Sequence, residues 1–562
     1  MTSHSASPAD APPTPTFGFL ANLRFDLPSG FLVFLIAMPL CLGIAKASQY
    51  EPIVGIWTAV IGGILTIFLS NSQLTIKGPA AGLIVVVETT VLVLGEKFAP
   101  EHATVEEKIA IGYRLALGVG VTAGVIQILF GLLKAGKLGE LVPLAPVHGM
   151  LAAIGITIMA KQFYPMIGIE KTPGGEPVSV IAAIPSKLSE MNPTIAWIGL
   201  AALAIMIGFP FLKARVKYLK SIPAQLVALL VAVPLGLYFG LANLTDEHGQ
   251  AKFLVYVPDV LQNPSAAFFL PDFRGVMTFT GMQFVILFAL IGSIESMLSS
   301  QAIDMLDPWR RKTDQNRDLL TIGIANTLCS TIGALPMISE IVRSKANIDN
   351  GARTKYANLF HGLFLLAFVL FLPSLIRMIP LAALGAMLVY TGFRLASPRE
   401  FIHTYKIGLE QLVVFVATIA VTLCTDLLIG VCSGIGLKIL IHLLNGAPLR
   451  SLLRPDIEVA HTEGDEIAVL KVRHAAVFSN WLGVKSAVLR YGETCSEVQL
   501  DLSDTRLVDH TVMEKLHLLQ MEFAANGKKL SLLGLDKHTP LSSHPLAARK
   551  STQRTETPTA AV

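Results

Sequence analysis

The chain has 562 residues, of which 52% are hydrophobic and 15% are charged, and its mean hydropathy is +0.60. This composition is too apolar for an ordinary soluble enzyme and predicts a polytopic membrane protein. The net charge of +4 is modest, and no basic tract suits nucleic acid, so we expect no nucleic-acid partner. The five cysteines lack metal-ligand spacing and are interpreted as structural thiols.

Residues 1–24 are rich in Ser, Ala, Pro and Thr without an apolar core, so we predict a disordered segment and no cleavable signal. Hydrophobic runs long enough to cross a bilayer then recur through residues 25–447. We predict about fourteen spans in two repeats, residues 25–241 and 277–445. A cytoplasmic N-terminus places the basic loops on one face, as the positive-inside rule requires. The prediction is a multi-pass protein of the inner (plasma) membrane, in contact with its lipid, with both termini cytoplasmic.

The first repeat contains an interrupted helix. Residues 75–82 read Thr-Ile-Lys-Gly-Pro-Ala-Ala-Gly, which predicts a short extended run followed by a half-helix from Pro79 to Leu94. Proline suits the first turn of a helix, because the N–H that it lacks has no helical partner there. Glu88, further along this half-helix, is expected to lie near the outer interface in contact with water.

The second repeat contains a similar break within residues 333–345. Leu335-Pro336 interrupts the hydrophobic run, and Ser339 is predicted to cap a helix that begins at Glu340. Interrupted helices at matching positions of two repeats indicate a transporter's binding site. The backbone N–H groups at the two helix starts, including those of Ala80 and Ala81, are therefore expected to bind an anion between them.

Two charged residues lie at the second break. An ionisable residue inside a membrane segment is a functional hypothesis by default. Arg343 is predicted to supply the counter-charge for the anion; the alternative is an internal ion pair with Glu340, three residues earlier on the same helical face.

A carboxylate and a hydroxyl lie four residues apart in the eighth span, at Glu295 and Ser299. They are suited to coordinating a sodium ion or holding a proton, and the alternative is a structural partner for a nearby basic residue. An ionised Glu340 would repel the anion, so we expect it to be protonated, paired with Arg343, or sharing a cation with Glu295. The last two favour symport, because cation binding removes the repulsion.

The composition becomes that of a soluble domain after the last span. Residues 455–540 are predicted to form a small α/β domain, and the Pro-, Ser- and Thr-rich residues 541–562 a disordered tail. The predicted strands are 466–472, 498–502 and 529–534, and the predicted helices are 479–491 and 511–526.

The order of these pieces resembles the SulP family of anion permeases, the sulfate permeases, which carry a cytoplasmic STAS domain. The motifs that carry the resemblance are Asp26–Gly30, Gly78–Gly82, Gly333–Pro336, Arg343-Ser344, Asn347 and Gly351 in the membrane part, with Asp501–Asp504 and Val508–Thr511 in the STAS-like part. The resemblance implies an α-helical fold of about fourteen spans in two inverted seven-helix repeats, divided into a core and a gate, with the core carrying the anion. It also implies a homodimer. The STAS loop has His510 and Thr511 where a phosphorylatable Ser often follows Asp, so regulation by phosphorylation is not expected.

The residue patterns and the resemblance together define a candidate site. The cation-coupling residues are Glu295, Ser299 and Glu340, with a sodium ion assigned to the first two. The anion-binding residues are Ala37, Leu40, Ala80, Ala81, Ser339, Val342, Arg343 and Ser344.

The function that we predict is secondary active transport of a small inorganic anion, sulfate or bicarbonate, by symport with sodium or a proton. Two alternatives stay open: a dicarboxylate transporter of the same fold, and an anion-sensing membrane scaffold that signals through the STAS domain. The sequence shows no nucleophile with a base, no metal-ligand cluster and no phosphate-binding Gly loop. We therefore predict no enzyme activity and no cofactor apart from the possible sodium ion.

Overall fold

The computed structural model describes residues 18–141, 143–170, 172–173, 175–216, 219, 222–245, 249–425, 427–460 and 466–551. The chain divides into two compact units. The first contains the residues up to Gly136 together with Ile154–Leu395, and the second contains Lys137–Ala153 and the residues from Ala396 onward. Each unit is described by itself.

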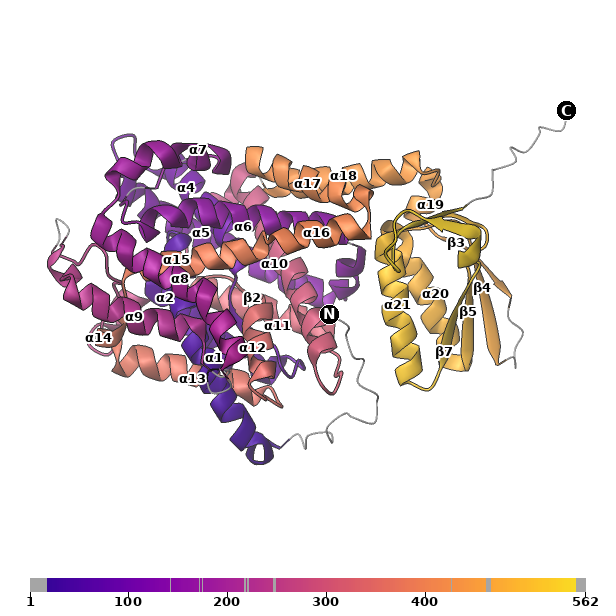
Figure 1. The fold of residues 1–562 in the computed structure, drawn as a ribbon, viewed down its shortest axis with the longest axis horizontal. Coiled ribbons are helices and arrows are strands. Elements are labelled where there is room, and N and C mark those ends of the chain that lie inside the picture. Colours follow the sequence, from indigo (N-terminus) through magenta and orange to yellow (C-terminus); the bar gives the residue numbers. More distant parts are fainter. Residues whose placement is uncertain are drawn as a thin grey trace. The chain divides into compact units, whose positions relative to one another are not determined.

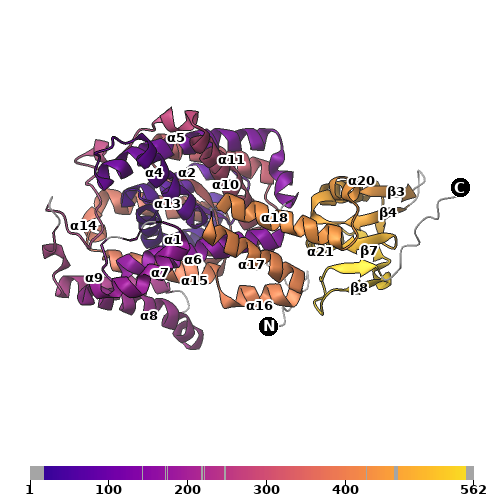
Figure 2. The same cartoon turned by 90° about the horizontal axis from the view of Figure 1, so that it is seen from above.

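The first unit is built from helices (Figures 1 and 2). Helix α6 (Leu144–Met166) begins in the second unit and ends in the first. The others are α1 (Phe19–Ala47), α2 (Pro52–Ile64), α3 (Thr66–Leu69), α4 (Ile84–Phe98), α5 (Val105–Leu132), α7 (Pro177–Lys187), α8 (Pro193–Arg215), α9 (Ala224–Tyr238), α10 (Phe279–Leu306), α11 (Gln315–Thr331), α12 (Ile341–Asp349), α13 (Tyr356–Phe371), α14 (Pro373–Ile376) and α15 (Leu381–Leu395).

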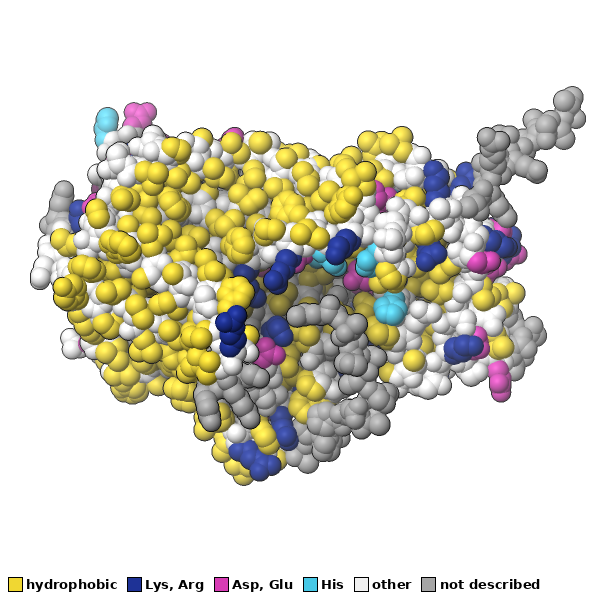
Figure 3. Space-filling view, viewed as in Figure 1, with side chains coloured by type: hydrophobic (Ala, Val, Ile, Leu, Met, Phe, Trp, Pro, Cys, Tyr) yellow, Lys and Arg dark blue, Asp and Glu magenta, His cyan; other side chains and the backbone are white. Residues whose placement is uncertain are grey.

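These helices are those of a membrane protein. Within the described residues, eight helical segments are long and apolar enough to cross a bilayer, and three shorter apolar helices accompany them. Figure 3 shows hydrophobic side chains spread over the surface of this unit, where charged side chains are sparse. A surface of this kind suits lipid rather than water, so the chain is an α-helical polytopic membrane protein.

Two short strands interrupt the helices. Strand β1 (Ile76–Pro79) pairs antiparallel with β2 (Met337–Glu340), and both pack against α2. A Cβ added to Gly62 of α2 would lie 2.7 Å from the carbonyl oxygen of Lys77. Only glycine at this position lets α2 approach the strand so closely. Extended backbone at membrane depth needs partners for its polar groups, and each strand supplies them to the other.

The second unit contains α16 (Pro398–Ile407), α17 (Leu409–Cys424), α18 (Leu427–Leu444) and α19 (Leu449–Leu453), followed by a mixed sheet. The sheet order is β7-β5-β4-β6-β9-β8, with β3 pairing with β4. Helices α20 (Trp481–Thr494) and α21 (His510–Ala525) lie on one face of it (Figure 1). The strands are β3 (Asp456–Ala460), β4 (Ile467–Ala476), β5 (Glu497–Asp501), β6 (Thr505–Val508), β7 (Lys529–Leu533), β8 (His538–Pro540) and β9 (Arg549–Ser551).

The structure differs from two predicted boundaries. Helix α1 begins at Phe19, so residues 19–24 belong to the first span and not to a disordered segment; residues 1–17 lie outside the described part. At the other end, β9 pairs with β6 and β8, so the folded domain continues past residue 540 to 551. Short edge strands give a weak sequence pattern, which is why β8 and β9 were not predicted.

Candidate functional site

The two interrupted segments meet, as the sequence predicted. Lys77 is paired with Ser339 and Gly78 with Ile338 in the β1–β2 ladder. Both half-helices begin later than predicted: a 3-10 turn over Ala81–Leu83 precedes α4, and α12 begins at Ile341. Ser339 is therefore not the N-cap, because strand pairing holds it in extended backbone and Glu340 takes the cap position. We call the region where the two strands pair the crossing.

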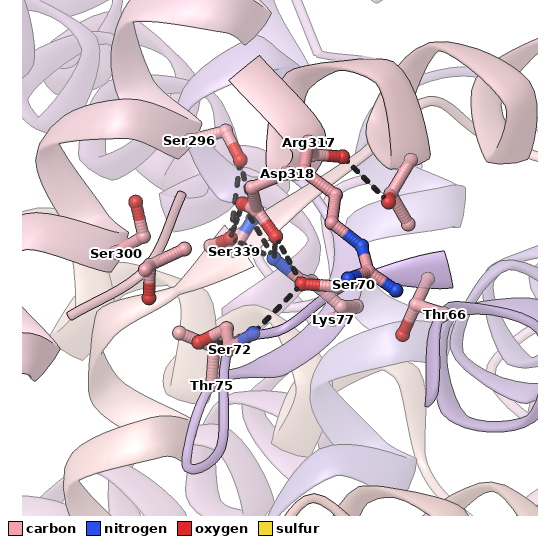
Figure 4. A network of polar contacts seen from close by, with 12 residues as sticks. Thr66, Ser70, Ser72, Thr75, Lys77, Ser296, Ser300, Arg317, Asp318 and Ser339 are labelled. Carbon is pink, nitrogen blue, oxygen red and sulfur yellow. Dashed lines mark hydrogen bonds and ion pairs between the residues drawn. The ribbon is translucent and has the colours of Figure 1, made fainter. Parts of the chain in front are cut away.

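One face of the crossing holds a buried ion pair (Figure 4). The Lys77 ammonium lies 2.7 and 2.8 Å from the two carboxylate oxygens of Asp318 on α11, and these residues are only 1% and 2% exposed. The same ammonium donates to the Ser339 hydroxyl at 2.5 Å, and Ser70 donates to Asp318 at 2.6 Å. Burying two charges is tolerated when they pair and their remaining groups are hydrogen-bonded, as they are here.

The predicted ligand Ser339 belongs to this network. Its hydroxyl accepts from Lys77 and from Ser296 of α10, at 2.5 and 3.1 Å, and its backbone N–H donates to the Ser296 hydroxyl at 3.2 Å. The Ser339 hydroxyl also donates to Asp318 at 3.3 Å. Its hydrogen-bonding capacity is used within the protein, which favours a structural role over anion binding.

Sequence reasoning did not single out Lys77 or Asp318. Lys77 lies within the first interrupted segment, residues 75–82, and Asp318 lies in the first turn of α11. A search for opposite charges within membrane segments, the reasoning applied to Arg343, would have found both.

Arg343 lies on the other face of the crossing. Its guanidinium is 1% exposed and packs on Gly78, where an added Cβ would lie 2.3 Å from Nη1. Nη1 donates to the Cys41 thiol at 3.4 Å, and Nε has no hydrogen-bond partner. Among the described residues, no carboxylate forms an ion pair with Arg343 within 4.0 Å, so the predicted alternative of a pair with Glu340 is not formed. The guanidinium charge is thus available to an anion.

Two carboxylates occupy the start of the first half-helix. Glu295 accepts a hydrogen bond from the backbone of Gly82, and Glu340 accepts one from the backbone of Ala81. A Cβ on Gly82 would lie 2.3 Å from both Glu295 oxygens. The Ala80 N–H donates to Pro336 O at 3.3 Å. The Ala80 and Ala81 amides, which we expected to bind an anion, are therefore bonded within the protein, to the Pro336 carbonyl and to the Glu340 carboxylate.

These carboxylates keep unused acceptors. Glu295 Oε2 and Glu340 Oε1 are buried without a hydrogen-bond partner. Glu295 lies within electrostatic range of Glu340, and Glu340 lies within electrostatic range of Arg343. Ser299 is buried on α10, one helical turn after Glu295. The two unpaired carboxylate oxygens are acceptors that a proton or a cation could use.

The remaining predicted residues surround the crossing. Ala37 and Leu40 are buried on α1, which also carries Cys41 beside Arg343. Val342 is half-buried in the first turn of α12, a turn that no side chain caps. Open backbone N–H groups and the positive end of a helix favour an anion there.

Ser344 has a structural contact. Its hydroxyl accepts from the Ile76 N–H at 2.8 Å and donates to the Glu340 carbonyl at 2.5 Å. The Ser344 side chain therefore links α12 to β1, and its hydroxyl proton is already donated to the Glu340 carbonyl.

The sequence predicted that Glu88 contacts water near the outer interface, and this prediction is wrong. Glu88 is buried in α4 and forms an ion pair with Lys161 of α6, with Nζ and Oε2 2.8 Å apart. The basic partner, 73 residues away in the chain, stabilises the buried carboxylate.

A cavity of about 230 Å³ lies elsewhere, at the end of α1. It is lined by Lys46, Glu51, Lys252, Tyr256 and Leu381, among others. None of the predicted site residues is among those that line it.

Comparison with known proteins gives a consistent result. Residues 23–418 match the sulfate permease family. The bicarbonate transporter BicA of Picosynechococcus sp. is 26% identical over 414 residues, 74% of this chain and 69% of BicA. The chloroplastic sulfate transporter 4.1 of Arabidopsis thaliana is 23% identical over 558 residues, 94% of this chain and 77% of that protein. The overall structure of SLC26A9 has the same fold, with a TM-score of 0.65 and 15% identity, covering 92% of this chain and 86% of that one.

Proposed function

The chain belongs to the sulfate permease family, and we propose that it is a secondary active transporter of a small inorganic anion, sulfate or bicarbonate. The names of its relatives support these two substrates. The observation that carries the proposal is the buried Arg343 guanidinium at the crossing, which has no carboxylate partner among the described residues. A buried charge is costly unless something pairs with it, and an anion does so.

We propose that the anion binds between Arg343 and the uncapped first turn of α12. The guanidinium offers a planar fork of donors that suits oxyanions, and the helix start adds backbone N–H groups and a positive dipole end. Ala37 and Leu40, which are buried on α1 near Cys41, would supply apolar contacts to the anion. The small alanine leaves room for a compact ligand, which is the reason to place sulfate or bicarbonate before a dicarboxylate.

Coupling to a cation follows from the two carboxylates. Glu295 and Glu340 lie within electrostatic range of one another, and a cation held by them reduces the negative charge near the anion. Each ligand then favours binding of the other, which is the thermodynamic basis of symport. We assign the cation to Glu295, Ser299 and Glu340, with sodium or a proton as the coupling ion.

Uptake by the purified full-length protein in liposomes tests the proposal. Labelled sulfate and labelled bicarbonate are offered with and without an inward sodium or proton gradient. Saturable, gradient-driven uptake of either anion is expected, and excess succinate should not compete. Competition by succinate would favour a dicarboxylate transporter, and saturable binding without flux would favour the sensing scaffold.

Orientation and assembly are part of the same proposal. The basic loops favour a cytoplasmic location for both termini and for the STAS-like domain in the plasma (inner) membrane. The family resemblance supports a homodimer.

A further inference from the structure

A histidine that the sequence analysis did not single out lies deep in the helical unit. His361 on α13 is 0% exposed, and within the described part of the chain neither of its ring nitrogens has a hydrogen-bond partner. Buried polar side chains are normally satisfied, because an unpaired donor or acceptor in a low-dielectric interior costs free energy. A fully buried imidazole with two unpaired nitrogens therefore suggests a role in binding.

The packing of α13 fixes where His361 lies. Gly30 of α1 allows α13 to approach closely, since a Cβ there would lie 2.6 Å from the Ala357 carbonyl oxygen and 3.0 Å from the backbone nitrogen of His361. Against α2, a Cβ on Gly362 would lie 3.0 Å from Gly63 Cα. The backbone around the histidine is held on two sides, so its ring has a defined location.

The neighbouring turn of α13 points to the crossing. Asn358, three residues before His361 and on the same helical face, accepts from the Lys77 N–H at 3.4 Å and donates to Gly62 O at 3.0 Å. The next residue of β1 is Gly78, and the Arg343 guanidinium packs against its backbone. His361 thus lies on the face of α13 that faces the anion site.

Burial is the main influence on the charge state of the His361 ring, and the Arg343 guanidinium is the charged group that adds to it. The elements beside α13 carry four other charged side chains: Arg24, Asp26 and Lys46 on α1 and Lys77 on β1. Arg24 lies over the Phe25 ring, and Lys46 lines the cavity at the end of α1. On β1, Lys77 is paired with Asp318. On α1, the Asp26 carboxylate accepts from the backbone N–H groups of Arg353 and Thr354, at 2.7 and 3.1 Å. Helix α2 carries no charged side chain.

We propose that His361 is the proton-carrying residue of the anion site: it takes a proton from water when an anion binds at Arg343 and releases it when the anion leaves. The proposal rests on the anion site of the proposed function. Without the anion, a second positive charge beside the guanidinium is unfavourable in this buried location. A bound dianion reverses the sign of the local field, so a ring nitrogen lone pair accepts one proton. The new N–H bond forms as an O–H bond of a hydronium ion breaks, and the water that remains returns to the solvent; the reverse occurs when the anion leaves.

The proposal makes anion binding depend on pH. If one proton enters with each anion, affinity falls about tenfold for each pH unit above the range in which the ring binds protons by itself. By the same linkage, a proton gradient drives anion accumulation. Sulfate is the suitable probe, because it keeps both charges across the range tested, whereas bicarbonate itself titrates.

Calorimetric titration of sulfate into the purified full-length protein tests the proposal. Measurements in buffers of different ionisation enthalpy give the number of protons taken up per sulfate bound. The wild type is expected to take up about one proton near pH 7.5. His361→Gln is expected to take up one proton fewer than the wild type and to lose the corresponding tenfold fall in sulfate affinity for each pH unit. His517→Gln, on the exposed face of α21, is the matched control and should behave as wild type.

Two outcomes overturn the inference. A wild-type proton count in His361→Gln does so, and so does loss of the proton count in Glu295→Gln but not in His361→Gln. If His361→Gln does not remain monodisperse, the smaller His361→Asn is measured in the same way. Failure of the proposed function is distinguishable, because the wild type would then neither bind nor transport sulfate or bicarbonate.

Discussion

The two faces of the crossing differ in how completely their polar groups are paired. On one face, Lys77, Asp318 and Ser339 are fully hydrogen-bonded to one another and to neighbouring serines. On the other, Arg343 and Glu295 each have a buried polar atom without a partner. Successive strand residues point to opposite faces, so two such different environments lie one residue apart. The paired face holds the strands together, and the unpaired face is where ligands would bind.

The largest effect is expected from breaking the paired face. Lys77→Met leaves the Asp318 carboxylate buried without its counter-charge, which costs about 3–5 kcal/mol of folding stability. Thermal unfolding of the purified variant in detergent, measured as loss of monodispersity, should occur at a clearly lower temperature than that of the wild type. The double variant Lys77→Met with Asp318→Leu should recover most of the loss. A single variant as stable as wild type would mean that the pair does not hold the crossing.

Arg343→Gln tests the unpaired face. Sulfate uptake is expected to fall about 100-fold, because charged hydrogen bonds to the anion are lost. Thermal stability should fall less than in Lys77→Met, since among the described residues Arg343 acts on Glu340 only at longer range and forms no ion pair with a carboxylate. Arg343→Lys should retain part of the uptake, because it keeps the charge without the fork. Normal uptake by Arg343→Gln would remove this residue from the site.

Glu295→Gln separates coupling from binding. The neutral side chain keeps the shape but not the charge, so accumulation driven by the sodium or proton gradient should fall about tenfold. Uptake down the anion's own gradient should continue. Glu190→Gln, an exposed carboxylate paired with Lys187, is the control. Unchanged dependence on both gradients would rule out the assignment of Glu295.

The smallest effect is expected from Gly82→Ala. The added Cβ would lie 2.3 Å from the Glu295 oxygens, so the carboxylate must move away from the α4 start. The coupling-ion concentration for half-maximal uptake should rise about fivefold, because a displaced ligand binds less well. Gly208→Ala on α8 is the control, since no atom lies within 4 Å of its added Cβ. Identical coupling in both variants would show that the position of Glu295 is not critical.

The two helix interruptions could be predicted from local sequence, because Gly78-Pro79 and Leu335-Pro336 disfavour a continuous helix, and the structure shows that the two segments pair. The same local rules failed for Ser339. A serine before a helix is a common cap, but pairing with Lys77 holds this one in a strand.

The partners within the site could not be predicted, because they are far apart in the chain. Lys77 and Asp318 are separated by 241 residues, and Glu88 and Lys161 by 73. A single sequence carries no signal for such pairings, whereas helix starts and breaks depend on a few consecutive residues. For the same reason the Ala80 and Ala81 amides were assigned to the anion, while the fold brings the Pro336 carbonyl and the Glu340 carboxylate to them.

The Lys77–Asp318 network joins four elements, β1, β2, α10 and α11, through side chains that are inaccessible to water. Parts fastened in this way move as a single body. If these elements shift together during transport, the groups around the anion keep their mutual geometry. Only the side of the membrane from which water reaches them changes. Selectivity would then be the same on both sides of the membrane, with direction set by the gradients alone.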